Sequence, residues 1–407
     1  MYKHRIKTLS IFIWFACAFF YALEYFIRSS SGALYDSFSF PPYNMTAAQI
    51  SISSSAFYLC YVASQLPAGM LVDKYGVKRI MIASTLIFSI AIYIASVSTS
   101  PVGIIIYRAL AGLGGGFAFL CAIKSIALWL PDRFFPLFTG MTQFFLYLGA
   151  TLSAAPLVII NNYYSISAIM SGVFIVSLAL FFISVFVIKL HPDFSKKQEA
   201  KKRKVSPFLI LISVLKNKQI WLNGFYCFTI YGTTVLFADL WGIKYLQLLG
   251  FSADVAGTCT SLIFIGVAIS SPLWGAIASL LNNEHKPLMV APIIGFVVTI
   301  ALLYLTTNIY AAFILCFLFG ACQAVHVLNY SALRSSVSPA RIATALALVN
   351  LFLPLSGGTL QPLTGGIIEF LSQNHSQLFA FQIALAIIPI LKILSFIISL
   401  FIKDHGK

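Results

Sequence analysis

GMLVDKYGVKR, residues 69–79, separates two long apolar runs and is too short to form a domain of its own. Gly69 would let a neighbouring helix approach closely, as small residues do in membrane interfaces. Asp73 can cap the next helix or pair with a base across a gap between helices, and Gly76 allows a tight turn. The two bases that end the stretch hold it on the cytoplasmic side of a membrane. It therefore predicts a short loop between two membrane-spanning helices, with an ordinary basic turn as the alternative.

The composition is that of a membrane protein. Of 407 residues, 60% are hydrophobic and 9% are charged, and the mean hydropathy is +0.93, whereas a soluble domain is about 25% charged. The formal net charge is +15. Of the 26 Lys and Arg residues, all but five lie in termini and loops on one predicted side, the side of both termini. This is the positive-inside bias of membrane proteins, so the basic balance does not indicate a nucleic-acid partner.

A membrane-spanning helix needs about 20 apolar residues, and the sequence predicts twelve such helices with both termini in the cytoplasm. We expect a six-helix bundle over residues 1–188, a basic cytoplasmic linker over 189–218 and a second six-helix bundle over 219–407. The first helix is expected to be retained, because no small-residue cleavage site follows it. The twelve spans are predicted near 8–29, 48–70, 80–98, 101–123, 137–160, 166–188, 220–243, 253–280, 288–307, 309–331, 341–370 and 377–402.

Residues 69–79 resemble the loop signature of the major facilitator superfamily, G-x-L-x-D-x-x-G-x-(K/R)-(K/R), which joins its second and third helices. The resemblance implies two six-helix halves related by an axis along the membrane normal, with a substrate site between them. Pro67 and Gly69 have counterparts in Pro272 and Gly275, while Ser279 stands where the second copy would need an acid. We predict conformational-gating roles for Gly69, Asp73, Gly76, Arg79 and Gly112.

Ionisable groups inside a bilayer are costly and are therefore functional candidates. On the first span, Glu24 and Arg28 are four residues apart and share one helix face with Tyr21. We predict that all three bind substrate. The alternative is a self-contained ion pair at the outer interface, with Arg28 reaching toward water.

The fourth span carries Arg108, four residues before Gly112, which resembles a motif of the superfamily. Arg108 is predicted to bind a carboxylate, either of the substrate or of Glu24, with a purely structural Arg–Glu tie as the alternative. Lys124, near the inner end of this span, is expected to extend toward water rather than to bind.

The seventh and tenth spans carry the remaining candidates. Tyr231 and Asp239 lie on the seventh, where Asp239 is expected to face the cavity or the outer vestibule. Gln323 and His326 lie three apart on the tenth. We predict substrate binding by all four and proton coupling by Glu24 and Asp239, whose pKa burial can raise; the alternative for His326 is a hydrogen bond to a neighbouring helix. Lys392 on the twelfth span is unexplained, because an outer helix normally keeps such a charge at an interface.

Phe20-Tyr21 with Glu24-Tyr25, and the string 239–242 followed by Tyr245, resemble the bacterial phagosomal nutrient-transporter branch of the superfamily. Members of that branch take up amino acids or nucleosides, so the resemblance implies import and nutrient uptake.

We therefore predict a secondary active transporter, a proton-coupled symporter that imports an amino acid, a small peptide or a similar organic ion across a bacterial inner membrane. The expected partners are a small-molecule substrate, protons and the lipid bilayer, with no nucleic acid, and the protein is expected to be a monomer. No cofactor, metal site or enzymatic activity is expected, since no P-loop or metal-ligand spacing is present. The alternatives are a proton-coupled exporter of drugs, metabolites or siderophores, and a membrane sensor that transports nothing.

Overall fold

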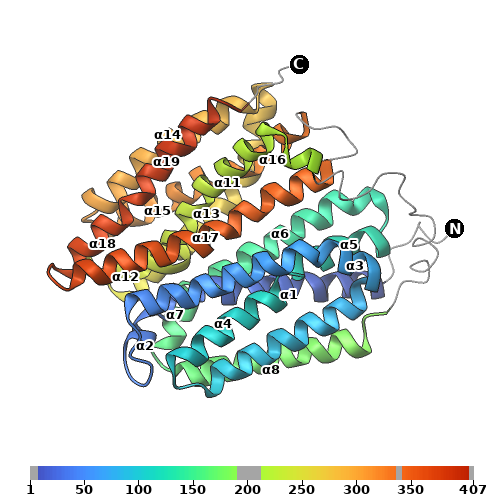
Figure 1. Cartoon of the computed structure of the whole chain (residues 1–407), viewed down its shortest axis with the longest axis horizontal. Helices are drawn as coiled ribbons and strands as arrows, with labels where there is room; N and C mark the ends of the chain where they lie inside the picture. The colour runs from blue at the N-terminus through green and yellow to red at the C-terminus, as the bar shows by residue number, and fades with distance from the viewer. Residues whose placement is uncertain (1–7, 190–211, 336–341, 403–407) are drawn as a thin grey trace. The chain divides into compact units, whose positions relative to one another are not determined.

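The computed structural model describes residues 8–189, 212–335 and 342–402, and every regular element within these ranges is a helix (Figure 1). The predicted all-helical fold is confirmed. Eleven helices in the described ranges are long and apolar enough to cross a membrane. Twelve spans and cytoplasmic termini stay predictions. Most of the predicted linker, residues 190–211, lies outside the described residues.

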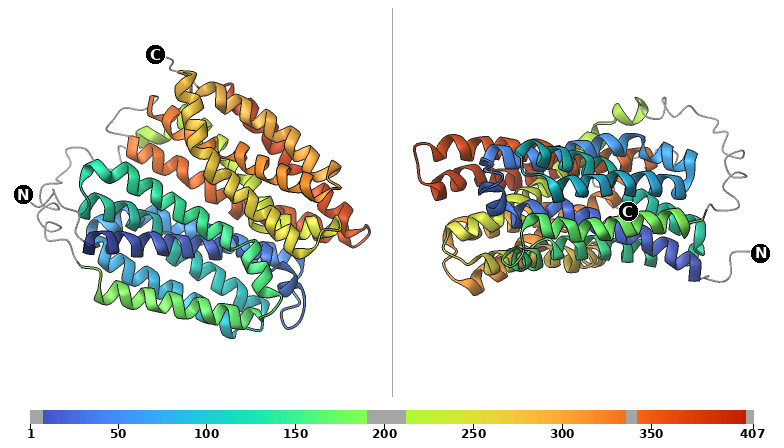
Figure 2. Two further views of the ribbon diagram at one scale, coloured as in Figure 1. Left: turned by 180° about the vertical axis from the view of Figure 1, so that it is seen from behind. Right: turned by 90° about the horizontal axis from the view of Figure 1, so that it is seen from below.

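The chain divides into two compact units. Unit 1 comprises Met1–Met45 and Ser53–Arg203, and unit 2 comprises Thr46–Ile52 and Lys204–Lys407. Figure 2 shows from two further directions that the long helices within each unit run side by side. In unit 1, for example, α1 packs along α5 and α6, and in unit 2 α14 packs along α19.

The first half of the chain forms α1 (Thr8–Ala33), α2 (Tyr35–Ser39), α3 (Ala47–Val97), α4 (Pro101–Gly115), α5 (Ala118–Trp129), η1 (Asp132–Phe134), α6 (Phe135–Leu152), α7 (Ala155–Asn161) and α8 (Ile166–Phe186). The second half forms α11 (Lys218–Leu236), η2 (Phe237–Trp241), α12 (Gly242–Leu248), α13 (Ala253–Leu280), α14 (His285–Ile300), η3 (Ala301–Leu305), α15 (Ile309–Gln323), α16 (His326–Ser335), α17 (Ile342–Ser372), α18 (Gln377–Leu385) and α19 (Ile387–Ser399).

Several helices begin at a residue whose side chain caps the first turn. Ser100 accepts a hydrogen bond from the Gly103 N–H at the start of α4, and Pro101 follows at a position where no N–H is needed. The same kind of side-chain cap starts α8, α11, α13, α15 and α18, at Ser165, Asn217, Ser252, Asn308 and Ser376. These polar residues fix where the apolar runs become helices.

The predicted loop over 71–79 is a sharp break within α3 rather than an open loop. Gly76 has φ 80° and ψ 161°, a conformation that only glycine adopts readily. The residues on either side of Gly76 are helical. The tight turn predicted at this glycine is therefore present, with helix continuing closer to it than the sequence indicated.

Two predicted spans are interrupted at matching places. α4 gives way to α5 after Gly115, and α15 gives way to α16 after Gln323. In each case the break starts four residues after a glycine that packs against another helix. A Cβ at Gly112 would lie 2.1 Å from the carbonyl oxygen of Phe57 on α3, and one at Gly320 would lie 2.0 Å from that of Ile263 on α13. Each unit thus holds the same close helix contact.

Candidate functional site

A buried ion pair lies on α1 in unit 1. Nε and Nη2 of Arg28 both donate to Oε1 of Glu24, at 2.9 Å and 2.5 Å. Glu24 is 0% exposed and Arg28 is 5% exposed. The Arg28 guanidinium carbon lies 4.2 Å from the ring centroid of Tyr61 and 4.7 Å from that of Tyr25, so aromatic faces enclose the cation. The pairing expected from the spacing of four is present, and whether it binds substrate stays a prediction.

Arg108 is fully buried and joins three helices of unit 1. Its guanidinium donates to the backbone carbonyls of Ile27 and Arg28 on α1, the latter at 3.0 Å, and to Oγ of Ser54 on α3 at 3.3 Å. These contacts satisfy carbonyls at the turn that carries the ion pair. They favour a structural role for Arg108, and its predicted contact with a substrate carboxylate stays untested.

The glycines of α4 make room for the Glu24 side chain. A Cβ at Gly115 would lie 2.4 Å from Cγ of Glu24, so any larger residue would displace the carboxylate. At the adjoining break, the Gln65 amide donates to the carbonyl of Gly116 at 2.8 Å and to the hydroxyl of Tyr61 at 3.0 Å. Sequence reasoning missed Tyr61 and Gln65, although two polar groups four residues apart in an apolar span were a usable signal.

Tyr21, the third candidate on α1, is 7% exposed. Its ring centroid lies 5.4 Å from that of Phe119 on α5. It therefore lies one turn before Glu24 in the same packed region of unit 1.

Unit 2 brings three of its four candidates together. The ring centroids of Tyr231 on α11 and His326 on α16 are 5.8 Å apart. Nδ1 of His326 lies 2.8 Å from the carbonyl oxygen of Gln323, and the Gln323 amide donates to Oγ1 of Thr233. A carbonyl only accepts, so Nδ1 carries a hydrogen in this arrangement. The break between α15 and α16 provides the carbonyl that His326 uses.

Asp239 lies further along the same span, eight residues after Tyr231 and so about 12 Å along the helix axis. It is 0% exposed and sits in η2, a π-helical turn between α11 and α12. Such turns inside α-helices occur frequently at functional sites. Whether the carboxylate faces a cavity or an outer vestibule stays a prediction, as does proton coupling by Asp239.

The candidate gating residues differ in what surrounds them. Nζ of Lys124 lies 2.5 Å from Oδ1 of Asp73, an ion pair across α3 and α5. The pair is partly exposed, so the expectation that Lys124 extends toward water rather than binding substrate stays a prediction. A Cβ at Gly69 would meet no atom within 4 Å, so the close helix approach expected there is wrong. Arg79 is exposed, and gating by all of these residues stays a prediction.

Lys392 on α19 is 0% exposed, contrary to the expectation of a charge at an interface. Its Nζ has no hydrogen-bond partner among the described residues and lies 5.4 Å from the ring centroid of Phe319. A Cβ at Gly295 would lie 3.0 Å from the same Nζ. Gly295 on α14 therefore leaves room for the amine of Lys392, which the aliphatic part of the lysine side chain carries from α19 into the bundle.

Comparison with known proteins identifies the family. The sequence profile described as Major Facilitator Superfamily matches residues 10–253 and 240–407. The chain belongs to the major facilitator superfamily. It is a multi-pass membrane protein of this superfamily, as the loop signature predicted. In the described ranges no group of three or more His, Cys, Asp or Glu is placed to hold a metal ion.

Curated relatives of this superfamily member are distant. It is 26% identical over 158 residues to the "Probable sulfoacetate transporter SauU" of Cupriavidus necator, covering 39% of this chain and 36% of the relative. It is 24% identical over 235 residues to "Probable anion transporter 2, chloroplastic" of Oryza sativa subsp. japonica, covering 52% and 44%. The chain spans less than half the length of these two relatives.

A solved structure with the same fold is that of a bacterial homologue of the human lysosomal transporter Spinster, in an inward-facing and unoccupied conformation. The TM-score is 0.81 at 14% identity, and the match covers 97% of this chain and 98% of that one. At this identity the likeness shows the fold alone.

Proposed function

We propose that this chain is a secondary active transporter that imports a small organic anion, or a zwitterion with a carboxylate, together with a proton. It works by alternating access, in a bacterial inner membrane and as a monomer. The observation that carries the proposal is the buried pair of Glu24 and Arg28.

The free-energy cost of the pair supports a functional role. An ionised side chain near the middle of a membrane helix costs about 2.5–3.5 kcal/mol on insertion scales. Replacing a buried ion pair by apolar side chains of similar volume is often neutral or stabilising. A helix that needed only packing at these two positions would therefore do as well without charges.

The geometry of the pair suggests how a proton and an anion are linked. Both Arg28 donors converge on one oxygen of Glu24, and a guanidinium fork is the group that suits a carboxylate or a related oxyanion. A proton on Glu24 weakens its hold on Arg28, and the guanidinium then becomes available to the solute. Because linkage is reciprocal, the bound anion also strengthens proton binding. The proton and the anion are then transported together.

The names of the relatives favour an acidic solute. One is named for sulfoacetate, which carries a carboxylate and a sulfonate, and the other for anions. In unit 2 we assign polar contacts with the remainder of the solute to Tyr231, Gln323 and His326, and a second proton site to Asp239. We assign Asp73 and Lys124 to the conformational change.

Transport by purified protein in liposomes tests the proposal. A panel of radiolabelled carboxylates, sulfonates and amino acids is offered with and without an inside-alkaline pH gradient. Uptake of an acidic solute should rise with the gradient. Glu24→Gln should keep solute counterflow but lose the stimulation by the gradient, because the amide resembles the protonated acid. Arg28→Met should lose counterflow, and Asp254→Asn, which changes an exposed acid on α13, should behave as wild type.

Other results would select the alternatives. Stimulation of uptake by the opposite gradient would indicate an exporter, because a proton antiporter exchanges outgoing protons for incoming solute. Binding of a solute without any flux would indicate a sensor. Stimulation by the gradient that survives in Glu24→Gln would remove Glu24 from proton coupling.

A further inference from the structure

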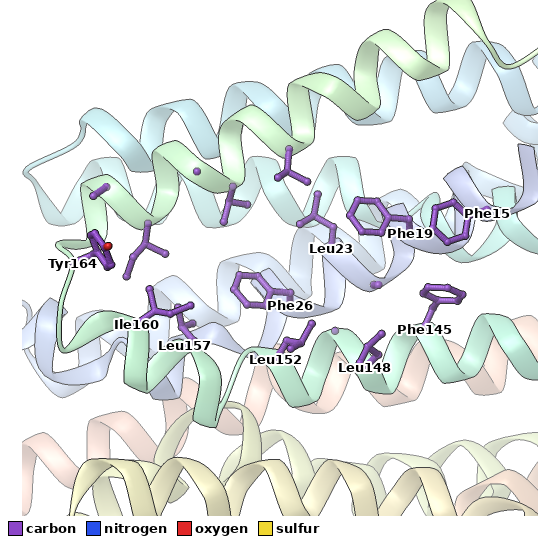
Figure 3. Close-up of a pocket in the computed structure, with 17 residues that line it drawn as sticks. Phe15, Phe19, Leu23, Phe26, Phe145, Leu148, Leu152, Leu157, Ile160 and Tyr164 are labelled. Atoms are coloured by element: carbon purple, nitrogen blue, oxygen red, sulfur yellow. The ribbon is translucent and has the colours of Figure 1, made fainter. Parts of the chain in front are cut away.

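A deep apolar groove runs along α1 in unit 1, between α6–α7 on one side and α8 on the other (Figure 3). Its cavity volume is about 600 Å³, which is in the size range of ligand pockets. The labelled side chains that point into it are almost entirely aromatic or aliphatic, and Tyr164 provides a hydroxyl at one end. None of the groups that we assign to transport lines it.

The groove exists because small residues form part of its walls. A Cβ at Gly149 on α6 would lie 2.1 Å from the carbonyl oxygen of Ala22, so α6 and α1 touch closely at its floor. Gly172 on α8 faces the groove, and a Cβ there would meet no atom within 4 Å. A larger residue at position 172 would fill space that is now empty.

The groove lies at bilayer depth and is continuous with the lipid-facing surface. Its walls come from helices that are candidate membrane spans. On α8, the side chain of Ile175, next to the groove residue Val176, is 66% exposed, and that of Phe186, further along the helix, is 74% exposed, as expected for residues that contact lipid tails. A second apolar cavity of about 370 Å³ shares Phe15, Phe19 and Val176 with the groove and extends it along α8.

The length of the groove matches one leaflet. From Phe15 to Phe26 it follows eleven residues of α1, or about 16 Å, and half of the hydrocarbon core is about 15 Å. Its end at Tyr164 adjoins Tyr163, and the two tyrosines are 62% and 80% exposed. Tyrosines in such positions mark the boundary between lipid tails and headgroups. A chain entering beside them would run along α1 toward Phe15.

We propose that this groove is a binding site for one acyl chain of a membrane phospholipid, whose headgroup lies beside Tyr163 and Tyr164. The site is distinct from the Glu24–Arg28 pair, and the inference does not depend on the proposed transport function. Its occupant is held longer than the other lipids around the protein, because it is surrounded by three helices rather than lying against one face.

The test compares Gly172→Leu, which fills the groove, with Gly140→Leu. Gly140 on α6 is also exposed, and a Cβ there would also meet no atom within 4 Å, but it does not line the groove. Each protein is placed in nanodiscs that contain phosphatidylethanolamine with a photoreactive acyl chain, and labelled peptides are mapped by mass spectrometry. We expect wild type and Gly140→Leu to be labelled several-fold more strongly at Leu148–Ile160 than on the exposed face of α19. Gly172→Leu should lose this excess.

Native mass spectrometry after detergent washing gives a second measurement. One phospholipid should remain on wild type and Gly140→Leu and be lost from Gly172→Leu; Ala168→Phe, on the same helix, serves if Gly172→Leu does not fold. Equal labelling of the groove and of α19, or an excess that persists in the filled variants, would overturn the proposal. So would retention of a second protein copy in place of a lipid.

Discussion

The two units share a helix contact but differ in how their buried charges are arranged. In unit 1 a glycine on α4, Gly112, lies against a backbone carbonyl of α3, and in unit 2 a glycine on α15, Gly320, lies against a backbone carbonyl of α13. Unit 1 also holds the charged side chains of Glu24, Arg28 and Arg108, each of which forms hydrogen bonds. Unit 2 holds neutral polar groups on α11 and α15–α16, the buried carboxylate of Asp239 in η2, and on α19 the amine of Lys392, for which no hydrogen bond is described. The contact is part of the scaffold, whereas the charges are specific to each unit.

The largest effect should come from breaking the ion pair of unit 1. Arg28→Met removes both hydrogen bonds to Glu24 and should lower the free energy of unfolding by about 3–5 kcal/mol, as when one partner of a buried pair is lost. Thermal unfolding of the purified protein in detergent measures this. The double variant Glu24→Gln with Arg28→Met should recover most of the loss. A double variant as unstable as the single one would show that aromatic contacts of Arg28, not the pairing, hold α1.

A smaller loss should follow when the shared contact is broken in either unit. Gly112→Ala and Gly320→Ala each place a Cβ near 2 Å from a carbonyl oxygen and should cost about 1–3 kcal/mol through overpacking. Size-exclusion profiles and unfolding midpoints report this. Gly275→Ala, where a Cβ meets no atom within 4 Å, is the matched control. If only one of Gly112→Ala and Gly320→Ala lowered the stability, the close contact would not have the same role in the two units.

Replacing the buried amine of Lys392 in unit 2 should raise the stability rather than lower it. Lys392→Met keeps the length of the side chain and removes a buried donor for which no partner is described, so the variant should gain about 1–2 kcal/mol in stability. Unfolding midpoints and transport are measured on the same preparation. A loss of stability comparable to that of Arg28→Met would mean that Lys392 has a partner that matters for folding.

The smallest effect should come from the half-exposed pair of unit 1. Asp73→Asn should change stability by less than about 1 kcal/mol, because exposed ion pairs contribute little. Its effect on transport should exceed its effect on unfolding, and exchanging the two charges in Asp73→Lys with Lys124→Asp should restore the rate. A rate that follows stability alone would remove the pair from gating.

The spacing of residues along the sequence predicted the helices and the contacts within one helix, but not the contacts between helices. The span near 253–280 coincides with α13, and the spacing of four placed Glu24 and Arg28 on one face. Two contacts of Arg108 were not predictable, because the acceptors are carbonyls some eighty residues away that every residue possesses. The contact of Gln65 with the Gly116 carbonyl was not predictable for the same reason, although its spacing of four from Tyr61 was.

The sequence by itself determined the membrane-spanning helices, the superfamily signature and the short-range pairing on α1. These depend on apolar run length and on the helical repeat, which neighbouring residues set. Only the tertiary structure decided that Gly69 faces open space while Gly112 is packed, that Lys392 is buried and that a groove follows α1. Those features depend on which helices, distant in the sequence, pack against each other, and the spacing of residues within one helix does not specify that.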